Sequence, residues 1–459
     1  MTSRPGTAGA QADSTAIPVN LELVTLTEDS AVLTWYTGAP GTDDGLGRMI
    51  PVPTNGEVWF GTRPDRLDRR VVAEGSTPYH HIELTGLEPG RAYYYRAVSQ
   101  GRSATPTFLA AGHAAGLPTP TPGVHSFTTP QPPPGRFLFS IALCNDLHLG
   151  ETVAGSIGQL PWVQGISQVS GRPPYPEIMT RALVTDAQAR GASYLLAAGD
   201  ITAEAEPIEL GNAKRLLDGF GRYQRDYFVA RGNHDRAHEG RAWQACTPGR
   251  WQGNDCYHDV FGDQTQPAYF EHDVHGLRIM GIDTYDKPGD GGDSGAMSSE
   301  QFAWFRHRLS RDRDRPTLVF GHHPLITPDA PQAITGGTSL AAQQASEVLA
   351  TYARTPGVFL HHAGHTHRNK RTALPGAPAV TQQEVAAVKE YPGGFTLLRV
   401  HSGGYAVNFY KTRAPLAREW SERSRQELAS TWPQLSLGNS VSDRNSVAAR
   451  DLSGIGRPV

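Results

Sequence analysis

The sequence predicts an α/β domain preceded by an all-β module, and three observations carry this prediction. Residues 17–130 alternate short apolar runs with Gly- and Pro-containing turns, as antiparallel strands do. The stretch QPPPG at 131–135 follows, and such a proline-rich segment is typical of a semi-rigid linker between domains. Beyond it, apolar strand-like runs alternate with helical stretches, which indicates a layered α/β domain.

These changes in pattern divide the chain of 459 residues into five predicted parts. We expect a disordered leader, a β-sandwich, a linker, an α/β domain and a C-terminal helix with a polar tail, at residues 1–16, 17–130, 131–136, 137–414 and 415–459. The C-terminal helix is expected over about 416–432. Within the α/β domain, Ser298 and Gln301 form a capping-box pattern that predicts a helix start near Ser298.

Composition and charge exclude several classes of partner. The net charge is −3, with 42 basic and 45 acidic residues, so we expect neither specific nucleic-acid binding nor association with an anionic membrane. No run approaches the roughly 18 consecutive apolar residues of a membrane helix. The N-terminal residues lack the apolar core of a signal peptide. We therefore expect a cytoplasmic protein from the chain as written, or an exported one if the true N-terminus is missing.

The chain has three cysteines. Cys144 ends an apolar run and is expected to be a buried, inert thiol. Cys246 and Cys256 share a Gly/Trp-rich loop and are near enough to pair. Two alternatives remain at this point: a disulfide, which implies an oxidising compartment, or two reduced loop thiols.

Polar side chains follow five apolar strands of the predicted α/β domain, at the point where each strand ends. Four of the five motifs begin with a glycine. In open α/β sheets, ligands bind outside the carboxyl ends of the strands. Five such strand ends therefore predict one shared site, built from Asp146-Leu147-His148, Gly199-Asp200, Gly232-Asn233-His234-Asp235, Gly321-His322-His323 and Gly364-His365-Thr366-His367.

Each motif has an ordinary structural explanation when it is taken alone. An isolated Asp-x-His or Gly-Asp is most often a solvated turn. Gly-Asn-His-Asp and Gly-His-x-His are rarer, because such polar groups at a strand end serve no obvious packing purpose. The combination in this order favours a functional site over five unrelated turns.

The ordered set of motifs resembles the calcineurin-like metallophosphoesterase superfamily, over residues 146–367 of this chain. The resemblance implies a four-layer αββα sandwich. Carried over position by position, it implies that Asp200 bridges two metal ions. The first ion would be bound by Asp146, His148 and His367, and the second by Asn233, His322 and His365.

The implied chemistry is hydrolysis of a phosphate ester by metal-bound hydroxide. Two cations about 3.5–4 Å apart clamp the attacking and leaving oxygens and lower the pKa of a bridging water. The resemblance implies that His234 is a catalytic residue that is not a ligand, protonating the leaving oxygen or stabilising its charge, and we expect Asp235 to orient its imidazole. Imidazole and carboxylate ligands without thiolate favour two divalent or trivalent transition-metal ions, namely Mn, Fe or Zn.

The N-terminal module carries a second resemblance. The stretch Leu87-Glu88-Pro89-Gly90-Arg91-Ala92-Tyr93 is similar to the tyrosine corner of fibronectin type III sandwiches, and the module is similar to the N-terminal domain of purple acid phosphatases. Purple phosphatases carry a tyrosine three residues after the Gly-Asp aspartate, where this chain has Ala203. They also lack the Asp-x-His motif. The ligand set is therefore more similar to class III cyclic-nucleotide phosphodiesterases.

Three functional hypotheses follow. The favoured one is a phosphodiesterase acting on a small-molecule phosphoester, and the close alternative is a phosphomonoesterase. A third, from another class, is a non-catalytic binding protein whose β-sandwich binds an unknown ligand. A decayed catalytic site would be expected to have lost ligand residues, and this sequence retains all seven of them.

Overall fold

The fold is taken from a computed structural model of the chain. The structure describes ten stretches of the chain, namely residues 16–42, 48–107, 119–155, 165–236, 245–251, 254–262, 266–288, 293–328, 338–427 and 433–456. The leader expected at 1–16 therefore lies almost wholly outside the described residues.

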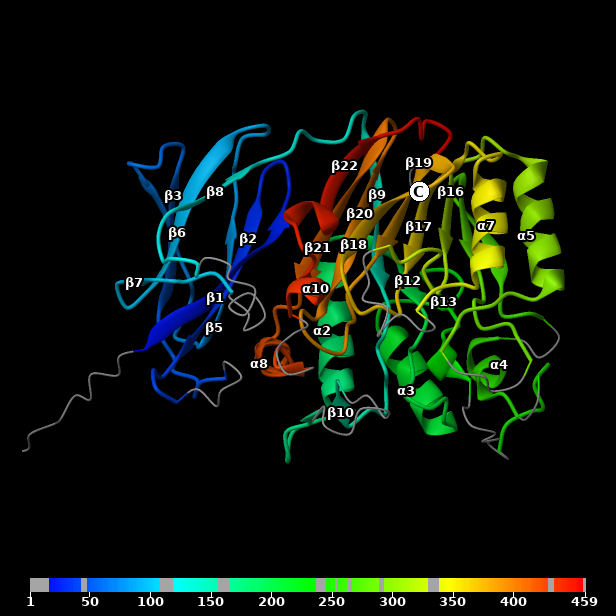
Figure 1. Cartoon of the computed structure of the whole chain (residues 1–459), viewed down its shortest axis with the longest axis horizontal. Helices are drawn as coiled ribbons and strands as arrows, with labels where there is room; N and C mark the ends of the chain where they lie inside the picture. Colours follow the sequence, from blue (N-terminus) through cyan, green and yellow to red (C-terminus); the bar gives the residue numbers. More distant parts are fainter. Residues whose placement is uncertain are drawn as a thin grey trace, which may run out of the picture.

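The N-terminal part is a β-sandwich, drawn in blue to cyan in Figure 1. One sheet has the order β1-β2-β5, with bounds Ile17–Leu26, Ala31–Gly38 and Tyr79–Leu84. The other has the order β4-β3-β6-β7 with β8 also paired to β6, and its strands are Arg69–Val72, Gly56–Gly61, Ala92–Ser99, Arg102–Ser103 and His125–Thr128. Aromatic side chains, among them Trp35, Phe60 and Tyr93, fill the space between the sheets.

The predicted tyrosine corner is confirmed. Tyr93 is buried in this core, and its hydroxyl accepts a hydrogen bond of 2.9 Å from the backbone N–H of Glu88. The turn that precedes β6 is thereby tied to the strand that follows it.

Two six-stranded sheets form the second part of the molecule (Figure 1). The first has the order β13-β12-β9-β20-β21-β22, with bounds Tyr227–Ala230, Ala192–Ala198, Phe137–Cys144, Gly394–His401, Gly404–Lys411 and Asn445–Ala449. The second has the order β14-β15-β16-β17-β19-β18, with bounds Phe270–Val274, Leu277–Gly281, Thr317–Phe320, Val358–Ala363, Ala377–Glu384 and Lys370–Leu374. Strands β9, β12 and β13 run parallel to one another, as do β15, β16, β17 and β19.

Helices cover the outer face of each sheet and complete an αββα arrangement. Helices α2 (Tyr175–Ala189) and α3 (Pro207–Leu217) pack on the first sheet, and their apolar residues belong to the same apolar cluster as residues of that sheet. Helices α5 (Ser299–Arg311) and α7 (Ala342–Tyr352) cover the second sheet over a separate apolar cluster. The predicted cap of α5 is confirmed, because Ser298 Oγ accepts from the N–H of Gln301 at 3.1 Å. Short elements complete the domain: β10 Val153–Ala154, β11 Ile166–Ser167, η1 Asn233–Asp235 and α4 Cys256–Phe261.

The C-terminal part differs from the predicted helix and polar tail. Helix α8 covers only Pro415–Ser424, and residues 428–432 of the expected helix lie outside the described residues. Helix α10 (Pro433–Leu437) and the turn η2 (Val441–Asp443) follow, and then β22 pairs antiparallel with β21 as the edge of the first sheet. Edge strands have one side without a partner strand and a weak apolar pattern, which is why the sequence of Asn445–Ala449 does not predict a strand.

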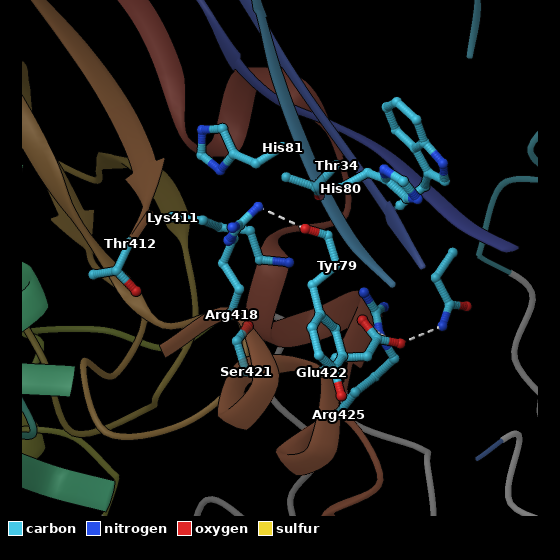
Figure 2. A pocket seen from close by; sticks show the side chains of 12 residues that line it. Thr34, Tyr79, His80, His81, Lys411, Thr412, Arg418, Ser421, Glu422 and Arg425 are labelled. Atoms are coloured by element: carbon cyan, nitrogen blue, oxygen red, sulfur yellow. Dashed lines mark hydrogen bonds and ion pairs between the residues drawn. The ribbon is translucent and has the colours of Figure 1, made fainter. Parts of the chain in front are cut away.

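The sandwich contacts the α/β domain through β1 and β5 on one side and β21 and α8 on the other. Glu22 of β1 is only 6% exposed, and it accepts from Arg425 Nη2 at 2.6 Å and from Lys411 Nζ at 2.9 Å. Tyr79 and His81 of β5 line a cavity of about 30 Å³ together with Arg418, Ser421 and Glu422 of α8 (Figure 2). This interface is charged and buried rather than a loose contact.

Cys246 and Cys256 form a disulfide, so the structure favours the first of the two alternatives for these cysteines. Cys144 is a free, buried thiol, as expected. Within the described residues, no helix combines the length and the apolar character needed to span a membrane.

The disulfide predicts how many thiols per chain react with a thiol reagent. In denaturant without reductant, a thiol reagent such as Ellman's reagent should react with one thiol per chain, that of Cys144. After reduction it should react with all three cysteines. Three reactive thiols before reduction would show that Cys246 and Cys256 are not paired in the isolated protein.

Candidate metal centre

The predicted site residues follow strands of both sheets and come together at their carboxyl ends. Asp146, Asp200 and Asn233 follow β9, β12 and β13 of the first sheet, whereas His322 and the pair His365 and His367 follow β16 and β17 of the second. The side chains form two groups in which the potential ligand atoms lie within 4.8 Å of one another: Asp146, His148 and His367, and Asp200, His322 and His365. The site therefore spans both sheets.

The backbone of these loops is strained at the site. Five of the residues have positive φ angles, a region that non-glycine residues seldom adopt: Asp146 at 53°, His148 at 46°, Asp200 at 49°, His365 at 67° and His367 at 48°. Such strain is retained where the surrounding structure fixes it, and it concentrates at functional sites. Here it turns successive side chains toward a common point.

The first group is organised around Asp146. Its Oδ1 lies 3.2 Å from His367 Nε2 and 3.9 Å from His148 Nε2. Asp146 is fully buried, and its other oxygen accepts from the N–H of His365 at 3.1 Å. Burial alone would raise the pKa of Asp146, but the imidazoles of His367 and His148 hold that pKa well below its usual range. The carboxylate is therefore ionised.

The second group is organised around Asp200. Its Oδ2 lies 3.0 Å from His322 Nε2, which in turn lies 3.0 Å from His365 Nδ1. The same Oδ2 is 3.6 Å from His148 Nε2 of the first group. Asp200 thus lies between the two groups, where a carboxylate shared by two cations must be.

The donor atoms fit metal ions on their geometry and their hydrogen bonding. Asp146 Oδ1 and His148 Nε2 are buried and, among the described residues, neither makes a hydrogen bond. Buried polar atoms without partners are uncommon and call for an explanation. Ligand atoms 3.2–3.9 Å apart can share one cation at metal–ligand distances of about 2 Å. The buried carboxylates supply the negative charge that two cations require.

The contacts of Asn233 and His323 bear on which residues of the second group can be ligands. Asn233 is buried in η1, and its Nδ2 donates to Asp293 Oδ1 at 3.4 Å. His323, which is not among the implied ligands, has both ring nitrogens engaged. Its Nδ1 is 2.7 Å from Thr284 Oγ1, and its Nε2 is 2.7 Å from the carbonyl of Asp293. This leaves His322 as the ligand candidate of the pair.

His234 lies at the edge of the site and is partly exposed. Its backbone N–H donates to Asp200 Oδ1 at 2.9 Å, and its ring centroid is 4.7 Å from that of His148. Its Nδ1 lies 2.7 Å from the carbonyl of Ala203. This contact holds the ring with Nδ1 turned toward the protein backbone.

Asp235 accepts hydrogen bonds from the loops on either side of His234. Its Oδ1 accepts from the N–H of Thr202 at 3.0 Å and from Thr202 Oγ1 at 2.9 Å, and its Oδ2 accepts from the N–H of Gly232 at 2.8 Å. Asp235 therefore braces the loops after β12 and β13, while the Ala203 carbonyl contacts the His234 ring. Burial and the charge of Asp200 raise the pKa of Asp235 to about 6.

Two carboxylates that sequence reasoning missed contact the first group. Glu151 Oε2 lies 3.1 Å from His148 Nδ1, and Glu390 Oε1 lies 2.5 Å from His367 Nδ1. Lys389 pairs with both. Glu151 is close to its histidine in sequence, and that spacing could have signalled it. Lys389 and Glu390 are more than 20 positions from His367 in an unremarkable segment, so no local pattern identifies them.

Comparison with known proteins gives two family matches. Residues 139–369 match the model of the calcineurin-like phosphoesterases. Residues 17–110 match the model of the purple acid phosphatase N-terminal domain. No curated protein matches the chain in sequence.

Several solved structures are similar to this fold. A dimetal phosphatase from Danio rerio is 16% identical, with a TM-score of 0.44, and the match covers 60% of this chain and 96% of that one. A purple acid phosphatase from yellow lupin (Lupinus luteus) is 14% identical, with a TM-score of 0.39 and coverage of 86% and 72%. A structure of PhoD is 11% identical, with a TM-score of 0.38 and coverage of 84% and 85%.

The glycines beside the predicted ligands give a test of the site. A methyl group at Gly232 would overlap Asp200 Oδ1 and its backbone nitrogen. We expect Gly232→Ala to displace Asp200 and to lower kcat/KM for a phosphoester by about 100-fold, because small misplacements at a reacting centre have effects of that size. Kinetics and metal content of the purified variant would measure this.

The matched control is Gly211→Ala in α3, where an added methyl meets nothing within 4 Å beyond its own stretch of helix. Activity should be unchanged there. Equal activity of the Gly232→Ala variant and the wild type would contradict a site built around Asp200.

Proposed function

The chain belongs to the calcineurin-like phosphoesterase family, and we propose that it hydrolyses a small-molecule phosphodiester, with a phosphomonoester as the alternative substrate. The chain is a metal-dependent phosphoester hydrolase with a two-metal centre. The observation that carries the proposal is the position of Asp200, whose Oδ2 lies within reach of both His/Asp groups.

The proposed ligand sets follow the two groups. Asp146, His148 and His367 would hold one ion, Asn233, His322 and His365 the other, and Asp200 both. When bound, such ions supply the positive charge that offsets negative charge developing on the phosphate oxygens. Imidazole and carboxylate donors favour Mn, Fe or Zn.

His234 is the proposed source of the proton for the leaving oxygen. Its ring is partly exposed and lies beside His148, so an ester bound at the metals would meet it. The Ala203 carbonyl accepts from Nδ1–H, so the proton for the leaving oxygen would come from Nε2 of the imidazolium. A proton held at Nε2 would pass to the leaving oxygen as the ester bond breaks.

Two features support the preference for diesters. The Asp-x-His motif adds His148 to the first group, and its Nε2 lies 3.6 Å from Asp200 Oδ2. Position 203 is alanine and contributes its carbonyl to His234, whereas purple phosphatases have a metal-binding tyrosine there. The complete ligand groups and the family membership set aside the non-catalytic alternative.

The domain division and the compartment belong to the same proposal. We place the linker at 131–136, between the end of β8 at Thr128 and the start of β9 at Phe137. The Cys246–Cys256 disulfide supports function in an oxidising compartment, because reducing compartments keep such thiols in the reduced form. This favours the exported alternative over a cytoplasmic one.

Substrate preference is tested by comparing bis-p-nitrophenyl phosphate with p-nitrophenyl phosphate in the presence of Mn²⁺. We expect turnover of the diester, and we expect Asp200→Ala to abolish it because the shared carboxylate is lost. Turnover of the monoester alone would support the phosphatase alternative. If neither ester is cleaved and the protein binds no metal, the proposal is wrong.

The role of His234 is tested by leaving-group dependence. His234→Gln should lower kcat by about 10²- to 10⁴-fold for an ester with an alkyl leaving group, which needs a proton. The loss should be much smaller for p-nitrophenyl esters, because p-nitrophenolate leaves readily without one. The exposed His307 on α5 offers a control, His307→Gln, which should have no effect. Equal losses for both kinds of leaving group would exclude proton donation by His234.

A further inference from the structure

The two histidines of the first group are held by carboxylates that share one ammonium group. His148 Nδ1 lies 3.1 Å from Glu151, and His367 Nδ1 lies 2.5 Å from Glu390. Lys389 Nζ donates to both oxygens of Glu151 at 2.7 and 2.8 Å, and it lies 2.9 Å from Glu390 Oε2. One side chain thus connects the outer faces of both imidazoles.

The backbone of Lys389 reaches the third member of the group. Its N–H donates to the carbonyl of Asp146 at 3.3 Å, and the N–H of Val388 donates to the carbonyl of Asn145 at 3.1 Å. The segment between β19 and β20 therefore runs along the loop that carries Asp146. Lys389 contacts Asp146 directly and contacts His148 and His367 through one carboxylate each.

Burial strengthens the electrostatic interactions among these side chains. Lys389 is 4% exposed and Glu390 is 3% exposed, so water does not screen their charges. A third carboxyl, Glu427, lies beside Glu390, and burial together with the charge of Glu390 raises the pKa of Glu427 well above its usual range. Without the ammonium, the negative charges of Glu151 and Glu390 would repel each other and lose their fixed positions.

We propose that Lys389 is a positioning residue for the first metal ion. It fixes Glu151 and Glu390, which orient His148 and His367 so that both Nε2 atoms point at the ion. Carboxylates that hold ligating histidines commonly affect metal affinity by about 10- to 100-fold. This inference rests on the ligand assignment of the proposed function.

The same segment anchors the site to the N-terminal sandwich. The carbonyl of Lys389 accepts from Trp420 Nε1 of α8 at 2.7 Å, and the N–H of Tyr391 donates to Ser424 Oγ at 2.9 Å. The Tyr391 hydroxyl donates to Glu22 of β1. Glu22 is therefore the far end of a chain of contacts that begins at the metal ligands, which gives the sandwich a part in positioning the site.

The test is a titration of metal-depleted full-length protein with Mn²⁺, read by equilibrium dialysis and elemental analysis. Wild type should bind two ions. Lys389→Met should weaken one of them by about 10- to 100-fold and leave the other unchanged. Lys389→Arg should restore most of the affinity, because a guanidinium can pair with both carboxylates. Lys214→Met, which removes a partly exposed lysine paired with Asp218 far from the site, is the control and should bind as wild type does.

Double variants identify which ion is affected. In a His365→Ala background, which damages the second group, Lys389→Met should weaken the remaining ion by the same factor. In a His367→Ala background, which damages the first group, it should add no further loss, because the two changes act on one site. Equal additional losses in both backgrounds would overturn the proposal.

Further outcomes separate this inference from the function on which it rests. If the wild type binds no Mn²⁺, the two-metal function fails. If the wild type binds two ions and Lys389→Met matches its affinities, only the positioning role fails. If circular dichroism shows that Lys389→Met does not fold, the same titration is made with Glu390→Gln. That variant removes the ion pair with Lys389 and keeps an acceptor for His367. Tyr391→Phe should weaken the same ion by a smaller factor, and unchanged binding would remove the sandwich from the proposal.

Discussion

The burial of two aspartates at the centre of the α/β domain is the constraint on which the rest of the structure depends. Asp146 is 0% exposed and Asp200 is 2% exposed. Ionised carboxylates buried without partners would be very costly, so each must be surrounded by donors or cations. The imidazoles of both groups, and the backbone N–H groups of His234 and His365, meet this need. The positive φ angles of the ligand loops follow from the same demand, because they turn these groups inward.

This demand also explains why two sheets are required. The first sheet supplies both aspartates, and the second supplies His322, His365 and His367. Neither sheet alone could surround the charges. The sheets approach closely at this edge because glycines stand at the contacts. A methyl at Gly364, for example, would lie 2.6 Å from Asn145 Cβ and 2.8 Å from Asp146 Oδ2. The close packing of the sheets and the geometry of the site therefore depend on the same glycines.

The sequence was most informative where chemistry is concentrated in short motifs. The aspartates and histidines of the two groups, the tyrosine corner at Tyr93 and the cap at Ser298 could all be predicted, because each depends on neighbours along the chain. The structure added what depends on distant contacts. Lys389 has no motif, and its importance comes from pairing with Glu151, which lies 238 positions away. Strand β22 was missed for a similar reason, because only its pairing with β21 makes it a strand.

The attachment of the sandwich follows the same electrostatic logic at a second place. Glu22 belongs to the sandwich, but Arg425, Lys411 and Tyr391, which satisfy it, belong to the α/β part and its C-terminal helix. Separating the two parts would leave a carboxylate on one side and two cations on the other without their buried partners. Pairs of this kind stabilise little overall, but breaking them on one side is costly, so they favour a single docking geometry. The segment between β8 and β9 therefore joins parts whose relative position is set by buried charge and not by the segment itself.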